Sequence, residues 1–269
     1  MLKVKLYQVD AFTNKLYCGN PAAVVLLNNW ISEELMQQIA AENNLSETAF
    51  VVNEGNIFEI RWFTPKTEVA LCGHATLASA YVIFNFTNYN KNLIEFRSKK
   101  RGILQVEKKN ELYILNFPAD FPLEIEIPEL LINAFNYKPI KVLKGITDYL
   151  FVFDDQKKIE TIEPNYEIIK KSQARGIIVT SKGENKDFVS RFFAPFVGIN
   201  EDPVTGSAHT MLIPYWSKEL NKSKLNASQL SKRRGELTCE LAEDRVKIGG
   251  EAVLYLTGEI DICNELVNE

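Results

Sequence analysis

The second half of the chain repeats short motifs of the first half in the same order. A Phe-x-Pro motif at residues 63–65 recurs at 193–195, an offset of 130. A Gly-x-Ala motif and a longer Ser-Lys-x-Arg-Gly-x-Leu motif both recur at an offset of 133. Each match is weak alone, but three in one order indicate a duplicated domain. The longer offset places three extra residues in the second half, between its first two motifs. The Gly-x-Ala motif occupies residues 73–75 and 206–208, and the Ser-Lys-x-Arg-Gly-x-Leu motif occupies residues 98–104 and 231–237.

Hydrophobic patterns predict similar elements in both halves. Each half begins with a buried strand, continues with a helix and two further strands, and then enters a helix that is apolar on nearly every face. A helix of that kind has to be buried on every face. In the first half we expect strands at 22–27, 48–52 and 57–63, a helix capped by Ser32, and the apolar helix at 75–84. In the second half we expect strands at 150–153, 176–180 and 188–193, a helix near 164–172, and the apolar helix at 208–216.

These patterns predict an α/β fold with mixed sheets. We expect two similar domains, each a strongly curved mixed sheet around one central helix, with the active site in the interdomain cleft. The N-terminal domain is predicted at residues 1–119, a connection at 120–138 and the C-terminal domain at 139–269. Residues 255–269 are candidates to pack back onto the N-terminal domain. Pro214 is expected to kink or end the second central helix.

The overall composition is that of a globular protein with an ordinary core. Of 269 residues, 46% are hydrophobic and 25% charged, and the net charge of −4 gives no reason to expect nucleic acid or an anionic membrane as partner. No charged-then-apolar leader and no apolar run of about 20 residues is present, so we expect a cytoplasmic protein. Four cysteines without CxxC spacing and only two histidines predict no metal site.

Residues 200–209, Asn-Glu-Asp-Pro-Val-Thr-Gly-Ser-Ala-His, are the most informative stretch for function. An acid pair precedes a glycine that opens an apolar helix, and such a helix start offers backbone N–H donors to an anion. The two histidines of the chain are His209, in this stretch, and His74, beside the matching glycine of the first half. We therefore interpret the two stretches as halves of one site. The alternative is that Gly73 and Gly206 only allow close packing of helix and sheet.

Positions where the halves differ are the candidates for catalysis. Glu47 precedes a buried strand, whereas the matching stretch, 173–176, has no acid. A carboxyl group in a cleft suits proton transfer, because burial raises its pKa towards the working pH. His74 aligns with Ser207, and Asp202 lies within the longer segment of the second half. For Glu47 the alternative is a surface carboxylate, and for Asp202 a structural cap of the following turn.

Two further residues are expected to be structural. His209 lies about one turn inside a buried helix, which favours a hydrogen-bonded core histidine. Cys72 directly precedes Gly73, as in racemases that use two thiols, but the matching residue before Gly206 is Thr205. A two-thiol proton exchange is therefore excluded, and a buried, inert Cys72 is favoured. The sequence has no motif typical of nucleotide, flavin or metal enzymes, so no cofactor is predicted.

Several motifs together resemble the phenazine-biosynthesis isomerase-like (PhzF-like) family, which has the diaminopimelate-epimerase-like fold. They occur in order from residue 10 to about residue 235, so the resemblance covers most of the chain. The motifs are Asp-Ala-Phe-Thr at 10–13, Gly-Asn-Pro-Ala-Ala-Val at 19–24, Asn-Leu-Ser-Glu-Thr at 44–48, Cys-Gly-His-Ala-Thr at 72–76 and Asp-Pro-Val-Thr-Gly-Ser-Ala-His at 202–209.

The resemblance implies a cofactor-independent isomerase that shuttles a proton on a small carboxylated, partly unsaturated ring, and a homodimer. The family's catalytic glutamate falls on Glu47, and its histidine and aspartate fall on His74 and Asp202, which would hold and polarise the substrate. The donors to the substrate carboxylate and a further cleft residue fall on Gly73, Gly206, Ser207 and Asn20.

Two alternatives stay open at this point. One is an epimerase or dehydratase of the same fold that uses Cys72 with Thr205. The other is a non-catalytic protein that binds a small acid on an enzyme scaffold.

Overall fold

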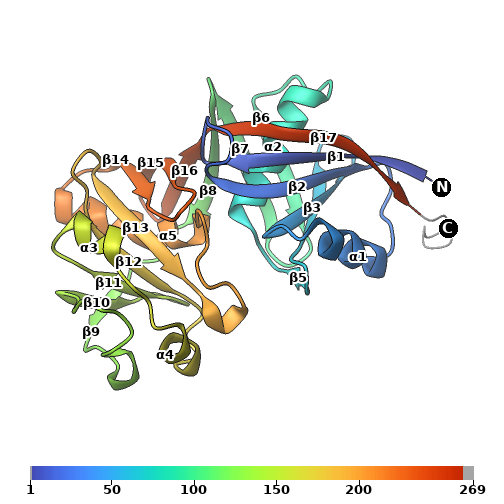
Figure 1. Cartoon of the computed structure of the whole chain (residues 1–269). Helices are drawn as coiled ribbons and strands as arrows, with labels where there is room; N and C mark the ends of the chain where they lie inside the picture. The colour runs from blue at the N-terminus through green and yellow to red at the C-terminus, as the bar shows by residue number, and fades with distance from the viewer. Residues whose placement is uncertain (1, 263–269) are drawn as a thin grey trace. The chain divides into compact units, whose positions relative to one another are not determined.

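The computed structural model describes residues 2–262, and contacts divide them into two units (Figure 1). Unit 1 comprises residues 2–116 and 249–262, and unit 2 comprises 117–248. The predicted packing of residues 263–269 lies outside the described residues. No helix in the described part of the chain is long and apolar enough to cross a membrane.

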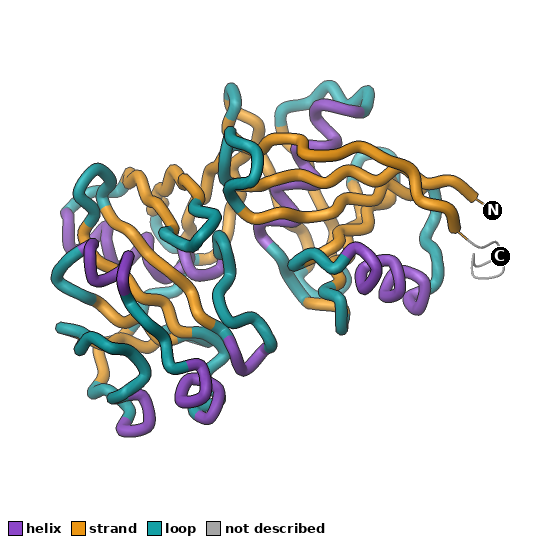
Figure 2. Tube along the Cα trace, in the orientation of Figure 1, coloured by secondary structure: helices purple, strands orange, loops and turns teal. Residues whose placement is uncertain are grey.

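Unit 1 is a mixed sheet with two helices (Figures 1 and 2). Its strands follow the order β17-β1-β2-β3-β4-β6-β7-β8, and β5 pairs with β4. The strands are β1 Leu2–Ala11, β2 Asn20–Leu27, β3 Glu47–Asn53, β4 Phe58–Phe63, β5 Glu68–Val69, β6 Leu93–Ser98, β7 Gly102–Lys109, β8 Leu112–Pro118 and β17 Ala252–Ile262. The helices are α1 Glu33–Asn43 and α2 Gly73–Phe86.

Unit 2 is built in the same way, with strand order β9-β10-β11-β12-β13-β14-β15-β16. Its strands are β9 Leu123–Ile125, β10 Lys141–Lys144, β11 Tyr149–Val152, β12 Ile177–Lys182, β13 Phe188–Phe193, β14 Lys224–Gln229, β15 Gly235–Ala242 and β16 Arg245–Gly250. Its helices are α3 Gln156–Thr161, α4 Tyr166–Lys171 and α5 Gly206–Leu220, with 3-10 turns η1 Glu129–Leu131 and η2 Pro195–Val197. The stretch 120–138 thus contains β9 and η1, and β9 pairs with β10.

Both units repeat one pattern of strand pairing. In unit 1, β2 and β3 are parallel, β3 and β4 antiparallel, β4 and β6 parallel, and β6 and β7 antiparallel. In unit 2 the pairs β11–β12, β12–β13, β13–β14 and β14–β15 alternate identically. This agreement fits the duplication inferred from the sequence, and the α/β class with mixed sheets is confirmed.

The two long helices, α2 and α5, are the buried ones. Nearly every residue of α2 from His74 to Ile83 is buried, and so is most of α5 from Gly206 to Ser217. Within its unit, α2 packs against β1, β2 and β3, and α5 packs against β14 and β15. Burial on all sides is what an all-round apolar helix requires.

Helix α5 continues through Pro214 and ends at Leu220, so the proline does not end it. A proline has no N–H for the carbonyl four residues earlier, which here belongs to Thr210. That carbonyl accepts a hydrogen bond from the backbone N–H of Asp120 instead, at 3.0 Å. The partner that the helix cannot supply therefore comes from a distant part of the same unit.

Helix starts differ between the surface and the core. The shorter helices α1, α3 and α4 begin at Ser32, Asp155 and Asn165, and each of these side chains accepts a backbone N–H of the first turn. The buried helices α2 and α5 begin after Cys72 and Thr205, and neither residue makes a side-chain cap. The first N–H groups of both buried helices therefore find no acceptor on the side chain that precedes the helix.

Candidate active site

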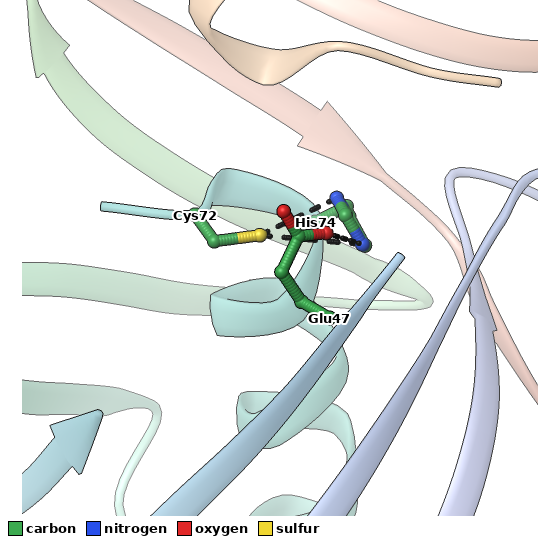
Figure 3. Close-up of side chains that lie close together, drawn as sticks. All are labelled: Glu47, Cys72 and His74. Carbon is green, nitrogen blue, oxygen red and sulfur yellow. Dashed lines mark hydrogen bonds and ion pairs between the residues drawn. The ribbon is translucent and has the colours of Figure 1, made fainter. Parts of the chain in front are cut away.

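Glu47 and His74 meet inside unit 1. Glu47 is the first residue of β3, and His74 is the second residue of α2. The imidazole Nε2 lies 3.2 Å from Oε2 of the carboxylate, and the two side chains are only 6% and 11% exposed (Figure 3). The two side chains meet because the start of the buried strand β3 lies next to the start of the buried helix α2.

The imidazole of His74 is neutral at pH 7, because burial lowers its pKa to about 3. The side-chain amide of Asn20, the first residue of β2, lies with Nδ2 3.1 Å from Nδ1 of His74. An amide NH₂ only donates, so Nδ1 accepts and the ring proton is on Nε2. His74 therefore donates a hydrogen bond to Glu47, and the contact is not an ion pair.

Cys72 completes the cluster. Its Sγ lies 3.5 Å from Nδ1 and 4.0 Å from Nε2 of His74, and the residue is buried, as predicted. The sequence did not reveal that this thiol contacts the imidazole. One ligand atom each from Glu47, Cys72 and His74 lies within 4.8 Å of the other two, so this is the place in unit 1 where side chains could hold a metal ion.

Unit 2 carries a second set of predicted residues around the start of α5. The hydroxyl of Thr205 donates to Oδ2 of Asp202 at 2.5 Å, and the Thr205 N–H donates to the side chain of Gln229 at 2.9 Å. The amide of Gln229 in turn donates to the Asp202 carbonyl at 2.8 Å. These bonds hold the turn that leads into Gly206, which is the structural role that the sequence left open for Asp202.

Ser207 has a neighbour that the sequence analysis did not identify. Nη2 of Arg175 lies 3.3 Å from the Ser207 hydroxyl, and Nε of the same guanidinium donates to buried Asp148 at 2.8 Å. The available signal was the mismatch between the halves, since Arg175 lies in the stretch that corresponds to Glu47.

Strand register shows which residue stands where Glu47 would be. Thr48 pairs with Phe63 in unit 1, and Ile177 pairs with Phe193 in unit 2. The residue before Ile177 is Gly176, so a glycine occupies the position equivalent to Glu47. A Cβ added there would lie 2.2 Å from the ring of Phe192, which leaves no room for a side chain.

The two acids at residues 201 and 202 have different partners. Glu201 binds the guanidinium of Arg191 through both carboxylate oxygens, at 2.6 and 2.9 Å. Nη1 of Arg191 donates to two backbone carbonyls, those of Ile159 and Ile162. Glu201 is therefore part of a satisfied structural network, whereas Asp202 stays beside the helix start.

His209 lies in the core of unit 2, as predicted. It has no exposed surface, and its Nδ1 donates to the Thr205 carbonyl at 2.8 Å. Burial lowers its pKa to about 4, although the carbonyl partner acts in the opposite direction. This histidine is neutral and packed in the core.

The predicted site residues thus form one group in each unit. Unit 1 holds a buried hydrogen-bonded cluster of side chains beside the start of α2. Unit 2 holds a turn and a helix start. The first group comprises Asn20, Glu47, Gly73 and His74, and the second comprises Asp202, Gly206 and Ser207.

Known proteins resemble this chain in both sequence and fold. The sequence profile of the family described as phenazine biosynthesis-like protein matches residues 9–258. An uncharacterized isomerase of Pseudomonas aeruginosa is 48% identical over 259 residues, which cover 96% of this chain and 99% of that protein.

Solved structures agree as well. A crystal structure of a phenazine biosynthesis protein of the PhzF family from Enterococcus faecalis superimposes with a TM-score of 0.94 at 47% identity, covering 97% of this chain and 100% of that one. A protein from Pseudomonas aeruginosa described as a predicted epimerase has a TM-score of 0.71 at 17% identity, covering 97% and 100%, which shows a shared fold.

The fold is therefore the epimerase-like fold of mixed α/β units. Within it, the chain belongs to the phenazine biosynthesis-like (PhzF-like) family, and it is an isomerase.

Proposed function

We propose that the protein is a cofactor-independent isomerase in which Glu47 moves a proton between two carbons of a small cyclic carboxylate. The single observation that carries the proposal is the buried hydrogen bond from Nε2–H of His74 to the Glu47 carboxylate. It shows a carboxylate in a water-poor site with a neutral hydrogen-bond donor beside it, which supports a role of this carboxylate in proton transfer.

In the proposed reaction Glu47 takes a proton from one carbon of the substrate and delivers a proton to another, and its carboxyl group exchanges with solvent between the two steps, so deuterium enters the product from heavy water. Negative charge spreads over the unsaturated ring and its carboxylate between the two steps. Neutral His74 donates a hydrogen bond throughout, first to the Glu47 carboxylate and then towards the developing charge. Because its pKa is about 3, the imidazole does not compete with Glu47 for the proton at neutral pH.

The substrate carboxylate is proposed to bind the uncapped helix starts. At α2 the first N–H groups, from Gly73 onward, have no side-chain cap and carry the positive end of the helix dipole. The α5 start, with Gly206 and Ser207, is uncapped in the same way, and Asp202 is proposed to help hold the substrate. That both helix starts contribute to binding the substrate carboxylate is inferred from the sequence repeat and from the family motifs.

The proposal is tested by hydrogen exchange in heavy water. Wild-type protein is expected to incorporate deuterium into a true substrate found in a screen of cyclic and amino-acid carboxylates, and Glu47→Gln should abolish the incorporation. Glu54→Gln is the matched control, because Glu54 is an exposed acid just beyond the other end of β3. If Glu47→Gln still incorporates deuterium into the substrate, the proposal is wrong. If the protein binds a carboxylate tightly but exchanges none of its hydrogens, a non-catalytic binding protein is favoured.

One alternative keeps the fold but changes the chemistry. An epimerase or dehydratase would use Cys72 with Thr205, and the position of the Cys72 thiol beside His74 favours it to that extent. Against it, the Thr205 hydroxyl is occupied by Asp202. The alternative predicts that Cys72→Ala and thiol alkylation both stop the reaction, and indifference to both treatments would remove it.

A further inference from the structure

Glu47, Cys72 and His74 offer three different donor atoms to one point in unit 1. Figure 3 shows the carboxylate, the thiol and the imidazole converging from two elements, the start of β3 and the start of α2. All three residues are buried, and their donor atoms lie within 4.8 Å of one another. Proton transfer by Glu47 requires the imidazole but gives no reason for a thiol at this point.

We propose that these three side chains bind a zinc-class divalent cation, and that the bound cation inhibits the enzyme. The inhibition, though not the binding, rests on the proposed role of Glu47. A thiolate, an imidazole and a carboxylate are the ligands of zinc, whereas magnesium and calcium require oxygen ligands.

The spacing of the donor atoms fits such an ion. With zinc bond lengths of about 2.0–2.3 Å and tetrahedral angles, neighbouring ligand atoms lie roughly 3.3–3.6 Å apart. Nε2 of His74 is 3.2 Å from the Glu47 oxygen and 4.0 Å from the Cys72 sulfur. The Glu47 oxygen and the Cys72 sulfur lie within 4.8 Å of each other, so side-chain shifts of up to about 1 Å bring all three atoms to binding distance, with one coordination position left over.

Binding also has a defined proton balance. The Cys72 thiol gives up its proton to solvent, because the thiolate is the ligand. The His74 ring proton moves from Nε2 to Nδ1, which frees the Nε2 lone pair and changes no net charge. Glu47 binds as the carboxylate, so one cation enters and one proton leaves.

Asn20 can support both states of His74. Its amide now presents Nδ2 to Nδ1 of the ring, at 3.1 Å. When the metal takes Nε2, Nδ1 carries the proton, and rotation of the amide by half a turn presents Oδ1 as the acceptor. Histidine ligands of metals regularly donate their second N–H to such a partner.

The cation is proposed to inhibit the enzyme because it binds the same atoms that the proposed reaction uses. A cation on Glu47 and on Nε2 of His74 removes the proposed base and its hydrogen-bond donor together. Removal of the cation restores both groups, so inhibition should be reversible by a chelator.

The binding test uses chelator-treated full-length protein and Co²⁺, whose thiolate charge-transfer absorption reports a Co–S bond without any substrate. Wild-type protein should show this band at one equivalent of Co²⁺, and Zn²⁺ but not Mg²⁺ should displace it. The near-isosteric Cys72→Ser should lose the band, whereas Cys18→Ser, which changes a partly exposed cysteine away from this cluster, should keep it.

The other two ligands and Asn20 provide graded variants. Glu47→Gln and His74→Ala should each weaken Co²⁺ binding by more than the ~10–100-fold that loss of an outer partner costs, and Asn20→Ala should fall within that range. Circular dichroism checks that each variant folds. A band that persists in Cys72→Ser, or no band in wild-type protein, overturns the metal site.

The exchange assay then separates the two proposals. One equivalent of Zn²⁺ should suppress deuterium exchange, and a chelator should restore it. If exchange continues while Zn²⁺ displaces the Co²⁺ band, inhibition is wrong and binding stands. If exchange depends on Glu47 but the band is absent, the metal site fails and the proposed function stands.

Discussion

The two buried helices begin alike but have different surroundings. Both α2 and α5 start with glycine after an extended residue that makes no side-chain cap. Beside α2 lies a buried cluster of carboxylate, imidazole and thiol; beside α5 lie hydroxyls, a carboxylate and an arginine. The comparison teaches that the two units share a backbone feature suited to anions while the side chains around it differ.

The clearest divergence is at the position of Glu47. Its equivalent in unit 2 is Gly176, where the ring of Phe192 and the carboxylate of Asp148 fill the space that a side chain would need. Arg175 stands next to it and binds that carboxylate. One unit thus places an acid at this position, and the other places a glycine beside an arginine–aspartate pair.

The largest effect on stability is expected from Glu201→Gln. Breaking the bidentate contact leaves the mostly buried Arg191 without its counter-charge, which should lower the free energy of unfolding by about 3 kcal/mol. Urea unfolding measures this. The control is Glu33→Gln, because Glu33 is exposed and its partner Arg61 keeps a second carboxylate, that of Glu68, so the loss should be less than about 1 kcal/mol. Equal losses in the two variants would contradict the structural role of Glu201.

The second prediction compares equivalent positions at the two helix starts. His74→Ala should lower kcat for deuterium exchange by about 10²-fold, because a preorganised buried donor is lost. Ser207→Ala, at the equivalent position in unit 2, should lower it only about tenfold, since one exposed hydrogen bond is worth about 1 kcal/mol. A larger loss for Ser207→Ala would reverse the roles assigned to the two units.

The third prediction concerns the glycine that replaces Glu47. Gly176→Ala should destabilise unit 2 by about 1–3 kcal/mol, because the added methyl group overlaps the Phe192 ring. In the control Gly258→Ala the nearest atom is 3.6 Å from the new Cβ, so little change is expected. Thermal unfolding compares the two. A neutral Gly176→Ala would show that the position tolerates a side chain and weaken the explanation for the missing acid.

The smallest effect is a pH dependence of the free energy of unfolding, to which each unit contributes one buried histidine. Folding lowers the pKa values of His74 and His209 from 6.5 to about 3 and about 4, so below pH 6.5 the unfolded chain binds protons that the folded chain does not. That stability is fully present above pH 6.5 and is lost as the pH falls. From about pH 7.5 to about pH 5.5 each histidine should contribute a loss of about 1.4 kcal/mol.

The measurement is urea unfolding of wild-type protein and of the variants His74→Gln and His209→Gln at both pH values. Each variant should show a smaller loss between the two pH values than wild-type protein. An identical pH dependence in wild-type protein and in His209→Gln would show that the second histidine is not buried neutral.

Local hydrophobic patterns and the motif repeat were enough to predict the fold class and the main buried elements. Apolar residues around the two long helices required their burial, and the motif repeat predicted two similar α/β units. Glu47 stood out because the second half has no acid at the matching stretch. Ser32 was identifiable as a cap because capping depends on residues within one turn.

Contacts between distant segments were beyond the sequence. Nothing in it pairs Arg191 with Glu201, Arg175 with Ser207, or the Thr210 carbonyl with the N–H of Asp120. The cluster of Cys72 with Glu47 was missed for a related reason. No single motif of the sequence has the spacing of metal ligands, because here the donor atoms come together through the packing of a strand start against a helix start.

The measurement that tests the central claim most directly is deuterium incorporation from heavy water into an accepted carboxylate substrate by wild-type protein, Glu47→Gln and Glu54→Gln. General acid–base catalysis by a positioned group is worth about 10²–10⁴-fold, so Glu47→Gln should lose at least that factor while Glu54→Gln exchanges at the wild-type rate. Incorporation by Glu47→Gln at the wild-type rate would contradict the assignment of Glu47 as the proton carrier.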